Sequence, residues 1–421
     1  MRSKNIVALA SAIVASSLAL AACSGSTGDN AGGGPVTLKV IGWKGSPAES
    51  AYLKDINAAF EKSHPNVKID YTYAQGNSYG QKLNAELLGG NAEDVFMAQP
   101  SDLPRWAKAG YLLNLSDQSW ATDLAAPVKS LVSAGKKVVA SPSELAGIGL
   151  YSNMKLLKAA GIDKAPTTWS EFVADQQALK KAGQPGLALP DKSGWTIYQA
   201  INASAASRVF AGKPNWNDDQ AAGKATFVSE DGWKKAMQQF VDLGDKGFVD
   251  YKAQLGIDEW SQGTQDFAAG KSAFLLQGSW AMSDLAKNGN QVQFTPWPGG
   301  DDGGQQAALT AVGTTWTINA KTSHKAEAQE YLKFWSSADA LTPYLTAESS
   351  LSPFTSVPTP KISGTETFNS TVTAGRFWVL PAGGWANEKG QTAMGQAVQG
   401  LLLGQSSIDK TLEAYDTAAK S

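Results

Sequence analysis

Carboxylates, two histidines and a single cysteine are the side chains of this 421-residue sequence that could act as acids, bases, nucleophiles or metal ligands. A serine or cysteine nucleophile usually needs a histidine as its general base. His64 precedes a proline and His324 lies far along the chain, so the two fit no metal-ligand spacing. Adjacent carboxylates such as Asp218 and Asp219 point apart on a strand or loop. The sequence therefore predicts no catalytic residue and no metal site.

Two stretches resemble cofactor or ion loops but lack required residues. Residues 269–272 (AGKS) look like the end of a phosphate-binding loop, yet Gln265 stands where the first glycine is needed. Residues 215–219 (NWNDD) resemble a calcium loop, but Gln220 replaces its glycine and Thr226 its bidentate glutamate. We therefore expect no cofactor. A glycoside hydrolase stays open as an alternative, because its two carboxyl groups can come from distant parts of a sequence.

Tryptophan is far more frequent than arginine in this chain. There are 14 tryptophans, and each offers a flat apolar platform with one hydrogen-bonding edge. The arginines are Arg2, Arg105, Arg208 and Arg376. Because arginine is the preferred partner of carboxylates and phosphates, a strongly anionic ligand is not favoured. The formal net charge of −2, without a basic stripe, argues against a nucleic-acid partner.

The amino terminus has the layout of a secretory signal. Arg2 and Lys4 give it a positive start, and residues 6–20 form an apolar run too short to span a bilayer. Small residues at 21–22 then precede Cys23, the only cysteine of the chain. One cysteine excludes an intramolecular disulfide.

The ending LAAC, residues 20–23, resembles a bacterial lipobox. This resemblance implies a lipoprotein signal peptide over residues 1–22 and lipid attachment at Cys23, the first residue of the mature chain. Residues 23–35 would then form the lipid anchor and a flexible Ser/Gly tether with a reach of about 20 Å. The expected location is extracytoplasmic, lipid-anchored to the outer face of the cytoplasmic membrane. The alternative is an ordinary signal peptide cleaved near Ala22, with an incidental cysteine.

The first half of the chain alternates strands with helices. Residues 36–43 (VTLKVIGW) and 67–73 (VKIDYTY) alternate apolar and other residues, which predicts two strands. Residues 46–49 (SPAE) form a capping box that opens a helix between them. Such a strand–helix–strand unit predicts parallel strands with a right-handed crossover. Residues 94–98 (DVFMA) predict a further buried strand.

The same pattern returns later. Residues 168–171 (TWSE) form a second capping box, and residues 273–277 (AFLLQ) predict a strand followed by a helix with Ser279 as its N-cap. Residues 308–318 contain strand, and Ser323 is the expected cap of the next helix. The sequence is thus of the α/β class. Its length exceeds what one hydrophobic core usually serves, so two lobes are expected.

Several short segments occur in an order and spacing typical of one family. They are residues 60–69 (FEKSHPNVKI), 79–83 (YGQKL), 94–96 (DVF), 151–153 (YSN), 160–162 (AGI), 166–172 (PTTWSEF), 267–274 (FAAGKSAF) and 277–280 (QGSW). Glu93 replaces a usual proline, and Ser152 replaces a second tyrosine. Over essentially the whole mature chain, the sequence resembles the family 1 extracellular solute-binding proteins. These are maltose-binding-protein-like carbohydrate lipoproteins of ABC importers.

The resemblance implies a type II periplasmic-binding-protein fold, with two lobes of mostly parallel sheet joined by a hinge. It places lobe one at residues 36–140 plus 300–348 and lobe two at 141–299 plus 349–421. It implies a monomeric, non-enzymatic receptor that closes on a small carbohydrate and delivers it to the permease subunits of an ABC importer. An exported glycoside hydrolase and a polysaccharide-capture protein without a transporter remain the alternatives.

Ligands of open α/β sheets bind beyond the carboxyl ends of strands, which selects residues that follow the predicted strands. A sugar face packs on tryptophan while polar groups hold its hydroxyls. Trp280 is the strongest single candidate, whereas Trp195 rests on the aromatic that related receptors offer there. The expected ligand-binding residues are Trp43, Gly45, Ser46, Glu49, Gln99, Ser101, Asp102, Glu144, Trp195, Tyr198, Trp280, Trp316 and Trp385.

Overall fold

A computed structural model describes residues 34–44, 51–74, 76–301 and 306–420. The chain divides into two units, Met1–Gly34 and Pro35–Ser421, and all the described helices and strands belong to the second unit. The predicted signal peptide, the predicted lipid-attachment site Cys23 and the predicted capping box at residues 46–49 lie outside the described residues.

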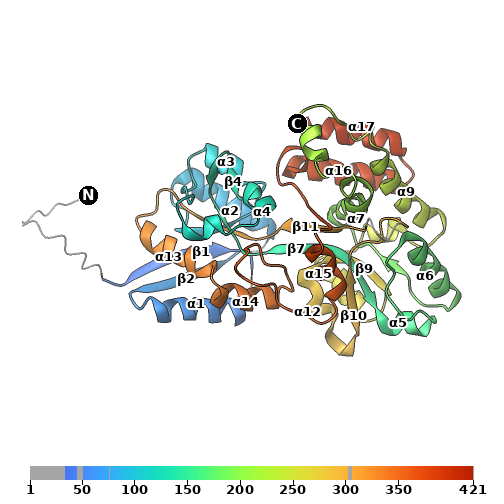
Figure 1. The fold of residues 1–421 in the computed structure, drawn as a ribbon, viewed down its shortest axis with the longest axis horizontal. Coiled ribbons are helices and arrows are strands. Elements are labelled where there is room, and N and C mark those ends of the chain that lie inside the picture. The colour runs from blue at the N-terminus through green and yellow to red at the C-terminus, as the bar shows by residue number, and fades with distance from the viewer. Residues whose placement is uncertain (1–33, 45–50, 75, 302–305, 421) are drawn as a thin grey trace, which may run out of the picture. The chain divides into compact units, whose positions relative to one another are not determined.

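The first sheet has five strands within the described residues. Their order is β2 (Val67–Tyr73), β1 (Val36–Gly42), β3 (Val95–Ala98), β12 (Thr315–Ile318) and β6 (Ser141–Pro142). β1 runs parallel to β2, as the strand–helix–strand pattern predicted, and it also runs parallel to β3. β12 is antiparallel to β3 and to β6, because it enters this sheet from the other half of the molecule. We call the part built on this sheet lobe one (Figure 1).

The helices of lobe one bury an apolar stripe against this sheet. In α1, for example, Leu53, Ile56 and Phe60 recur at helical spacing and are buried. The helices are α1 (Ala51–Ser63), α2 (Gly76–Gly89), α3 (Leu103–Lys108), α4 (Ala126–Leu131), α13 (Lys325–Trp335) and α14 (Ala338–Ala347). A short hairpin, β4 (Ser133–Ala134) with β5 (Lys137–Val138), completes the lobe.

The second sheet forms lobe two. Its strands within the described residues are β13 (Phe377–Val379), β11 (Ala308–Val312), β7 (Leu145–Asn153), β9 (Phe274–Gly278) and β8 (Leu187–Ala188), in that order, with β10 (Val292–Thr295) also pairing with β7. β7 is antiparallel to its partners β9, β10 and β11. Both sheets are therefore mixed instead of mostly parallel, because strands that arrive from the other lobe do not follow the strand–helix–strand rule.

Helices cover both faces of the second sheet. They are α5 (Met154–Ala159), α6 (Trp169–Lys181), α7 (Trp195–Ala205), α8 (Trp216–Ala221), α9 (Asp231–Asp245), α10 (Tyr251–Gln254), α11 (Gln262–Ala268), α12 (Met282–Leu285), α15 (Glu366–Thr373), α16 (Glu388–Leu402) and α17 (Ile408–Ala418). Among them lies an aromatic core of Trp216, Phe227, Trp233, Trp385 and Tyr415.

The chain passes between the two sheets near two of the expected lobe limits, residues 140–141 and 348–349, but the other crossing lies at residues 313–314 instead of 299–300. β6 leads into β7 through residues 143–144, and β11 leads into β12 through residues 313–314. A further crossing follows α14, where Leu351 pairs with Leu145. Residues 308–318, which were expected to contain strand, hold two strands in different sheets. β11 joins the second sheet, although the expected limits assigned residues 300–348 to lobe one.

Of the helix caps predicted within the described residues, one is confirmed and two are wrong. The N-cap at Thr168 is confirmed, since Thr168 Oγ1 accepts from the Glu171 N–H at 3.2 Å, but the Glu171 carboxylate accepts from the Thr167 N–H, one residue before the cap, at 2.8 Å. Ser323 is not the cap of α13, because that helix has His324 at its N-cap position and no side-chain cap. Ser279 also fails as a cap, since its hydroxyl instead accepts a hydrogen bond from the Gly147 N–H.

Candidate functional site

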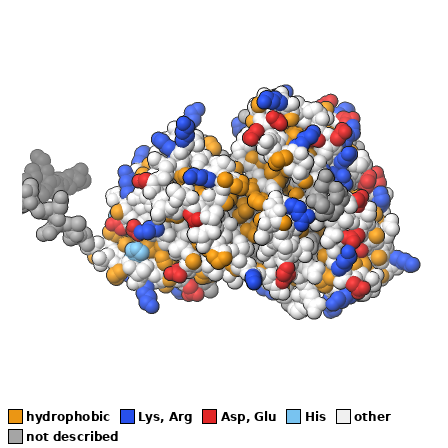
Figure 2. All heavy atoms as spheres, in the orientation of Figure 1, with side chains coloured by type: hydrophobic (Ala, Val, Ile, Leu, Met, Phe, Trp, Pro, Cys, Tyr) orange, Lys and Arg blue, Asp and Glu red, His pale blue; other side chains and the backbone are white. Residues whose placement is uncertain are grey.

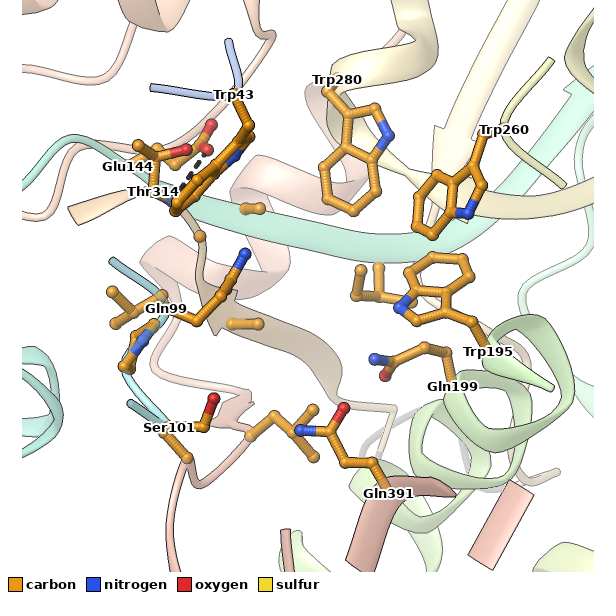
Figure 3. A pocket seen from close by; sticks show the side chains of 18 of the residues that line it. Trp43, Gln99, Ser101, Glu144, Trp195, Gln199, Trp260, Trp280, Thr314 and Gln391 are labelled. Carbon is orange, nitrogen blue, oxygen red and sulfur yellow. Dashed lines mark hydrogen bonds between the residues drawn. The ribbon is translucent and has the colours of Figure 1, made fainter. Parts of the chain in front are cut away.

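A cavity of about 650 Å³ lies between the lobes, beyond the carboxyl ends of β1, β3 and β9. Its lining comes from both sheets and from the strands that cross between them. Figure 2 shows hydrophobic side chains gathered at the notch between the lobes. Figure 3 shows the labelled side chains on two opposite walls with open space between them. This volume lies within the range of small-molecule sites.

The wall from lobe one is formed by residues that follow β1 and β3. Trp43 comes directly after β1, is half-buried, and packs edge-on against Tyr79 with ring centroids 5.0 Å apart. Gln99 and Ser101 follow β3, where the chain turns into α3. Gln99 is exposed, so its amide is available to a molecule in the cavity. This wall combines one aromatic face with hydroxyl and amide groups.

The opposite wall carries three indoles from lobe two, which we call the tryptophan cluster: Trp195, Trp260 and Trp280 (Figure 3). The ring centroids of Trp195 lie 4.7 Å from Trp260 and 6.0 Å from Trp280. Trp260 is 51% exposed, which is unusual for so large an apolar side chain. The cluster therefore presents an aromatic surface to the cavity.

Two amides extend this wall below the tryptophan cluster. Gln199 stands one helical turn after Trp195 on α7, so the two side chains share one face of the helix. The Oε1 atom of Gln199 is buried and has no hydrogen-bond partner among the described residues. Gln391 from α16 also lines the cavity. A buried acceptor without a partner beside a cavity is suited to a ligand hydroxyl.

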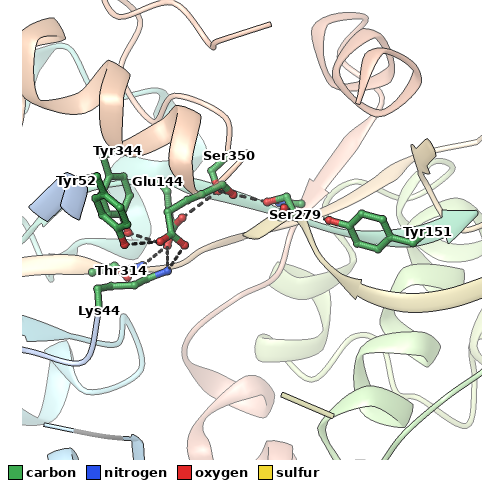
Figure 4. A network of polar contacts seen from close by, with 10 residues as sticks. Lys44, Tyr52, Glu144, Tyr151, Ser279, Thr314, Tyr344 and Ser350 are labelled. Atoms are coloured by element: carbon green, nitrogen blue, oxygen red, sulfur yellow. Dashed lines mark hydrogen bonds and ion pairs between the residues drawn. The ribbon is translucent and has the colours of Figure 1, made fainter. Parts of the chain in front are cut away.

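A buried polar network lies where the chain crosses between the lobes (Figure 4). Lys44 Nζ lies 3.4 Å from Glu144 Oε1 and 2.5 Å from Glu348 Oε2. Glu144 Oε1 also accepts from the Thr314 N–H and the Tyr344 hydroxyl, each at 3.2 Å. Burial alone would lower the pKa of Lys44, but the charges of Glu144 and Glu348 outweigh it and raise that pKa. We call Lys44, Glu144, Glu348 and their partners the hinge network.

Six of the expected ligand-binding residues line the cavity: Trp43, Gln99, Ser101, Glu144, Trp195 and Trp280. Glu144 differs from the others because it is 1% exposed and both of its carboxylate oxygens have protein partners. Gly45, Ser46 and Glu49 lie outside the described residues. The cavity thus brings together residues that are far apart in the sequence.

Four expected residues lie away from the cavity lining. Asp102 pairs with Arg105 at 2.6 Å at the start of α3. Tyr198 is 1% exposed and packs in the core of lobe two. Trp316 is buried on β12, with its ring centroid 5.3 Å from that of Trp335.

Trp385 is the fourth of these residues. Its glycine-framed segment suggested an exposed loop, yet it is 2% exposed. It packs against Trp216 and Phe227, and its indole N–H donates to Asn217 Oδ1 at 3.1 Å. This tryptophan therefore belongs to the core of lobe two.

Sequence reasoning missed several residues of the wall. Trp260 lies two residues before α11, in a turn where Asp258 Oδ1 accepts from the N–H groups of Trp260 and Ser261. The hydrogen bond from the Ser261 hydroxyl, together with those from the two N–H groups, lowers the pKa of Asp258. That turn was a usable signal, because it fixes a tryptophan at a helix start. Gln199 and Gln391 carried no local signal.

The lining gives no support to catalysis. The carboxyl groups among the described lining residues are those of Glu144 and Asp258, and Glu144 is fully engaged in the hinge network. Within the described ranges, no group of three or more His, Cys, Asp or Glu residues is placed to hold a metal ion. Over the same residues, no helix is long and apolar enough to cross a membrane.

A profile of the bacterial extracellular solute-binding proteins matches residues 44–342, which is well over half of the chain. The chain belongs to this family. Its members are binding proteins and not enzymes, and the resemblance inferred from the short sequence segments is confirmed. The two-lobe α/β fold is confirmed as well.

Individual proteins resemble the chain over half of its length or more. A multiple sugar-binding protein of Streptococcus mutans is 26% identical over 340 residues, 79% of each chain. An uncharacterized lipoprotein of Streptomyces antibioticus is 29% identical over 219 residues, 50% of this chain and 47% of that protein. The solved structure of a chitin oligosaccharide binding protein has a TM-score of 0.74 and 21% identity, covering 92% of this chain and 99% of that one.

Proposed function

We propose that this solute-binding protein captures a sugar or oligosaccharide in the cavity between its lobes and delivers it to the permease subunits of an ABC importer. Family membership and the likeness to a multiple sugar-binding protein support this role. The observation that carries it is the pairing of the tryptophan cluster on one wall with amide and hydroxyl groups on the other. Indole faces pack on the C–H faces of sugars, and the polar groups satisfy hydroxyls.

The proposed contacts follow from the lining. Trp195, Trp260 and Trp280 stack on the sugar, with Trp43 facing them from lobe one. Gln99, Ser101, Gln199 and Gln391 supply hydrogen bonds to hydroxyls. Glu144 acts through the hinge network, because its oxygens already have partners. Closure of the lobes about the crossing strands brings the two walls onto the ligand.

The proposed location is outside the cell, with the monomeric chain held by lipid on Cys23 to the outer face of the cytoplasmic membrane. The lipobox-like residues 20–23 support this location, as does the similarity to a protein named as a lipoprotein. Replacing Cys23 with serine in the native host should move the protein from the membrane fraction to the medium. Unchanged membrane retention of this variant would contradict lipid attachment at Cys23.

The central test is isothermal titration of the chain from Ser24 onward with neutral mono- and oligosaccharides. One sugar class should bind saturably without being broken down, and Trp280→Ala should weaken that binding by about tenfold or more, 1.4 kcal/mol per factor of ten. Trp169→Ala is the matched control, because Trp169 is a half-buried indole outside the cavity lining. Failure of every sugar to bind would overturn the proposal.

A further inference from the structure

The three indoles of the tryptophan cluster come from segments that are far apart in the sequence. Trp195 begins α7, Trp260 lies just before α11, and Trp280 follows the end of β9. A binding surface made of separate segments holds its geometry only if other contacts fix those segments relative to one another. The ring contacts alone are apolar and allow the rings to slide. Groups behind the cluster must therefore hold the three segments in place.

A set of polar contacts joins all three segments. The Ser193 hydroxyl donates to Glu259 Oε1, and the Trp195 N–H lies 3.4 Å from Ser193 Oγ. On the other side, Gln277 Nε2 donates to the Glu259 carbonyl oxygen at 2.9 Å. The Gly278 N–H donates to Gln277 Oε1, also at 2.9 Å, two residues before Trp280. Glu259 is thus the centre of a polar clip formed by Ser193, Glu259 and Gln277.

Burying the carboxyl group of Glu259 is unfavourable for the free energy of folding. Its side chain is 1% exposed, and no salt bridge joins it to a described lysine, arginine or histidine. Its Oε2 atom is buried without a hydrogen-bond partner among the described residues. Burying a carboxyl group with an unsatisfied oxygen is unfavourable. We therefore expect the buried Glu259 side chain to serve the arrangement of the indoles beside it.

Glu259 does not line the cavity, so it acts through the residues that do. We propose that Glu259 is a positioning residue that fixes Trp260 against Trp195 and Trp280 and thereby sets the sugar affinity of the tryptophan cluster. This inference rests on the proposed sugar-binding function for its affinity readout. Its structural readout, the mutual arrangement of the indoles, is independent of any ligand.

The test compares Glu259→Ala with Glu259→Gln in the chain from Ser24 onward. Glutamine keeps an oxygen that can accept from Ser193, so its affinity for the sugar bound by the wild type should stay within about threefold. Alanine removes that acceptor and should weaken binding by about tenfold or more. Because closely packed indoles interact optically, the near-ultraviolet circular dichroism of Glu259→Ala should change in the same bands as in Trp260→Phe.

Two further variants test the same hydrogen bond from its other partner and provide a control. Ser193→Ala removes the same hydrogen bond from an exposed residue, so it should fold and reproduce the dichroism change even if Glu259→Ala does not fold. Asp94→Ala is the matched control, because Asp94 also accepts from a hydroxyl, that of Thr322, but on lobe one outside the cavity lining. It should lower the melting temperature while leaving affinity and the indole bands unchanged.

The outcomes are separable. Wild-type affinity together with unchanged dichroism in both Glu259→Ala and Ser193→Ala would overturn the positioning role while leaving the proposed function intact. Absence of sugar binding by the wild type would overturn the proposed function, and the dichroism of the same variants would still decide whether Glu259 positions the indoles.

Discussion

At the scale of single residues, Trp260 is the side chain whose exposure most directly suggests a ligand. It is 51% exposed while its ring contacts Trp195 and Trp280. Trp260→Ala should weaken sugar binding by about tenfold and should lower the melting temperature less than loss of a fully buried tryptophan would, because about half of the Trp260 side chain is exposed. Leu88→Ala is the control: Leu88 is 77% exposed on α2 and should affect neither property. Unchanged affinity for Trp260→Ala in calorimetric titrations would remove this indole from the site.

Gly278 is a second single-residue determinant, because it makes room for an indole. A Cβ atom built on Gly278 would lie 2.1 Å from Trp280 Cη2, far inside normal contact. Gly278→Ala should therefore displace Trp280 and weaken binding about as much as Trp280→Ala does. Gly400→Ala is the control, since a Cβ there meets nothing within 4 Å and should add about 0.5–1 kcal/mol of helix stability. Wild-type affinity of Gly278→Ala, measured by the same titration, would show that the indole can rearrange freely.

At the scale of elements, α7 depends on a buried carboxyl group at its start. Asp191 Oδ1 accepts from the Ile197 N–H at 2.9 Å, and Oδ2 accepts from Gln399 Nε2 of α16 at 2.8 Å. Burial raises the pKa of Asp191 to about 6, and the neighbouring Glu259 carboxylate adds to the rise. Since α7 carries Trp195 and Gln199, Asp191 joins the position of the cavity wall to that of α16.

The raised pKa of Asp191 determines how its contribution to the free energy of unfolding changes with pH. Between about pH 4 and pH 6 the folded state holds a proton on Asp191 that the unfolded state has released. The stabilising contribution of this group is therefore present at low pH and is lost as the pH rises through 6. Asp191→Asn does not titrate, so the melting temperature of the variant minus that of the wild type should increase from pH 4 to pH 7. A difference that is constant over this range would contradict the raised pKa.

The carboxyl group of Glu171, at the start of α6, has a pKa shifted in the opposite direction to that of Asp191. Hydrogen bonds from Lys164 and from the Thr167 N–H lower the pKa of Glu171 to about 2. Its stabilising contribution is present above the ordinary glutamate pKa and is lost as the pH falls towards 2. Glu171→Gln should therefore lower the melting temperature at pH 7, and this difference from the wild type should shrink below the ordinary glutamate pKa and vanish only as the pH falls to about 2. Asp175 on the same helix is not a suitable control, because burial and Glu171 raise its own pKa to about 6.

Elements could be predicted from sequence where their cause is local. Strict alternation at residues 67–73 and the box at 168–171 each act within a few residues, and β2 and α6 were predicted from them. The direction of β12 was not predictable, because it depends on a crossing from β11 in the other sheet. The local sequence pattern was therefore enough to predict these elements. The direction of β12 could be known only from the path of the chain between the two sheets.

The same limit explains the candidate site. Trp280 and Gln99 were found because the ends of strands select them. Trp385 was assigned to the site on its glycine neighbours, yet the aromatic core of lobe two surrounds it. Gln391 reaches the cavity only because α16 packs beside α7, a contact between segments nearly two hundred residues apart that no local pattern records.

At the scale of the whole molecule, the hinge network joins the parts that must move relative to one another. Lys44 follows the first strand of lobe one, Glu144 and Thr314 lie on two crossings, and Glu348 and Ser350 lie on the third. Ser350 in turn contacts Ser279 at 3.2 Å, immediately before Trp280. A continuous set of hydrogen bonds therefore connects the crossings with both walls of the cavity (Figure 4).

Lys44 is the one described cation of this network that holds two carboxylates together. The side chains of Lys44, Glu144 and Glu348 are 17%, 2% and 11% exposed. Lys44→Met would leave two buried carboxylates facing each other, which should cost about 3–5 kcal/mol in the free energy of unfolding at pH 7. Lys68→Met is the control: its pair with Glu61 is exposed, so its loss should cost less than about 1 kcal/mol.

The pH dependence of the Lys44→Met defect distinguishes lost charge compensation from lost packing. Repulsion between the two uncompensated carboxylates weakens as the pH falls, so the stability gap between Lys44→Met and the wild type should be smaller at pH 5 than at pH 7. In the wild type the raised pKa of Lys44 keeps its stabilising contribution fully present at neutral pH, and it is lost only as the pH rises through that pKa. Urea unfolding at pH 5 and pH 7 measures both gaps. A gap that is equal at the two values would assign the defect to packing and would exclude charge compensation as the force that holds the three crossings together.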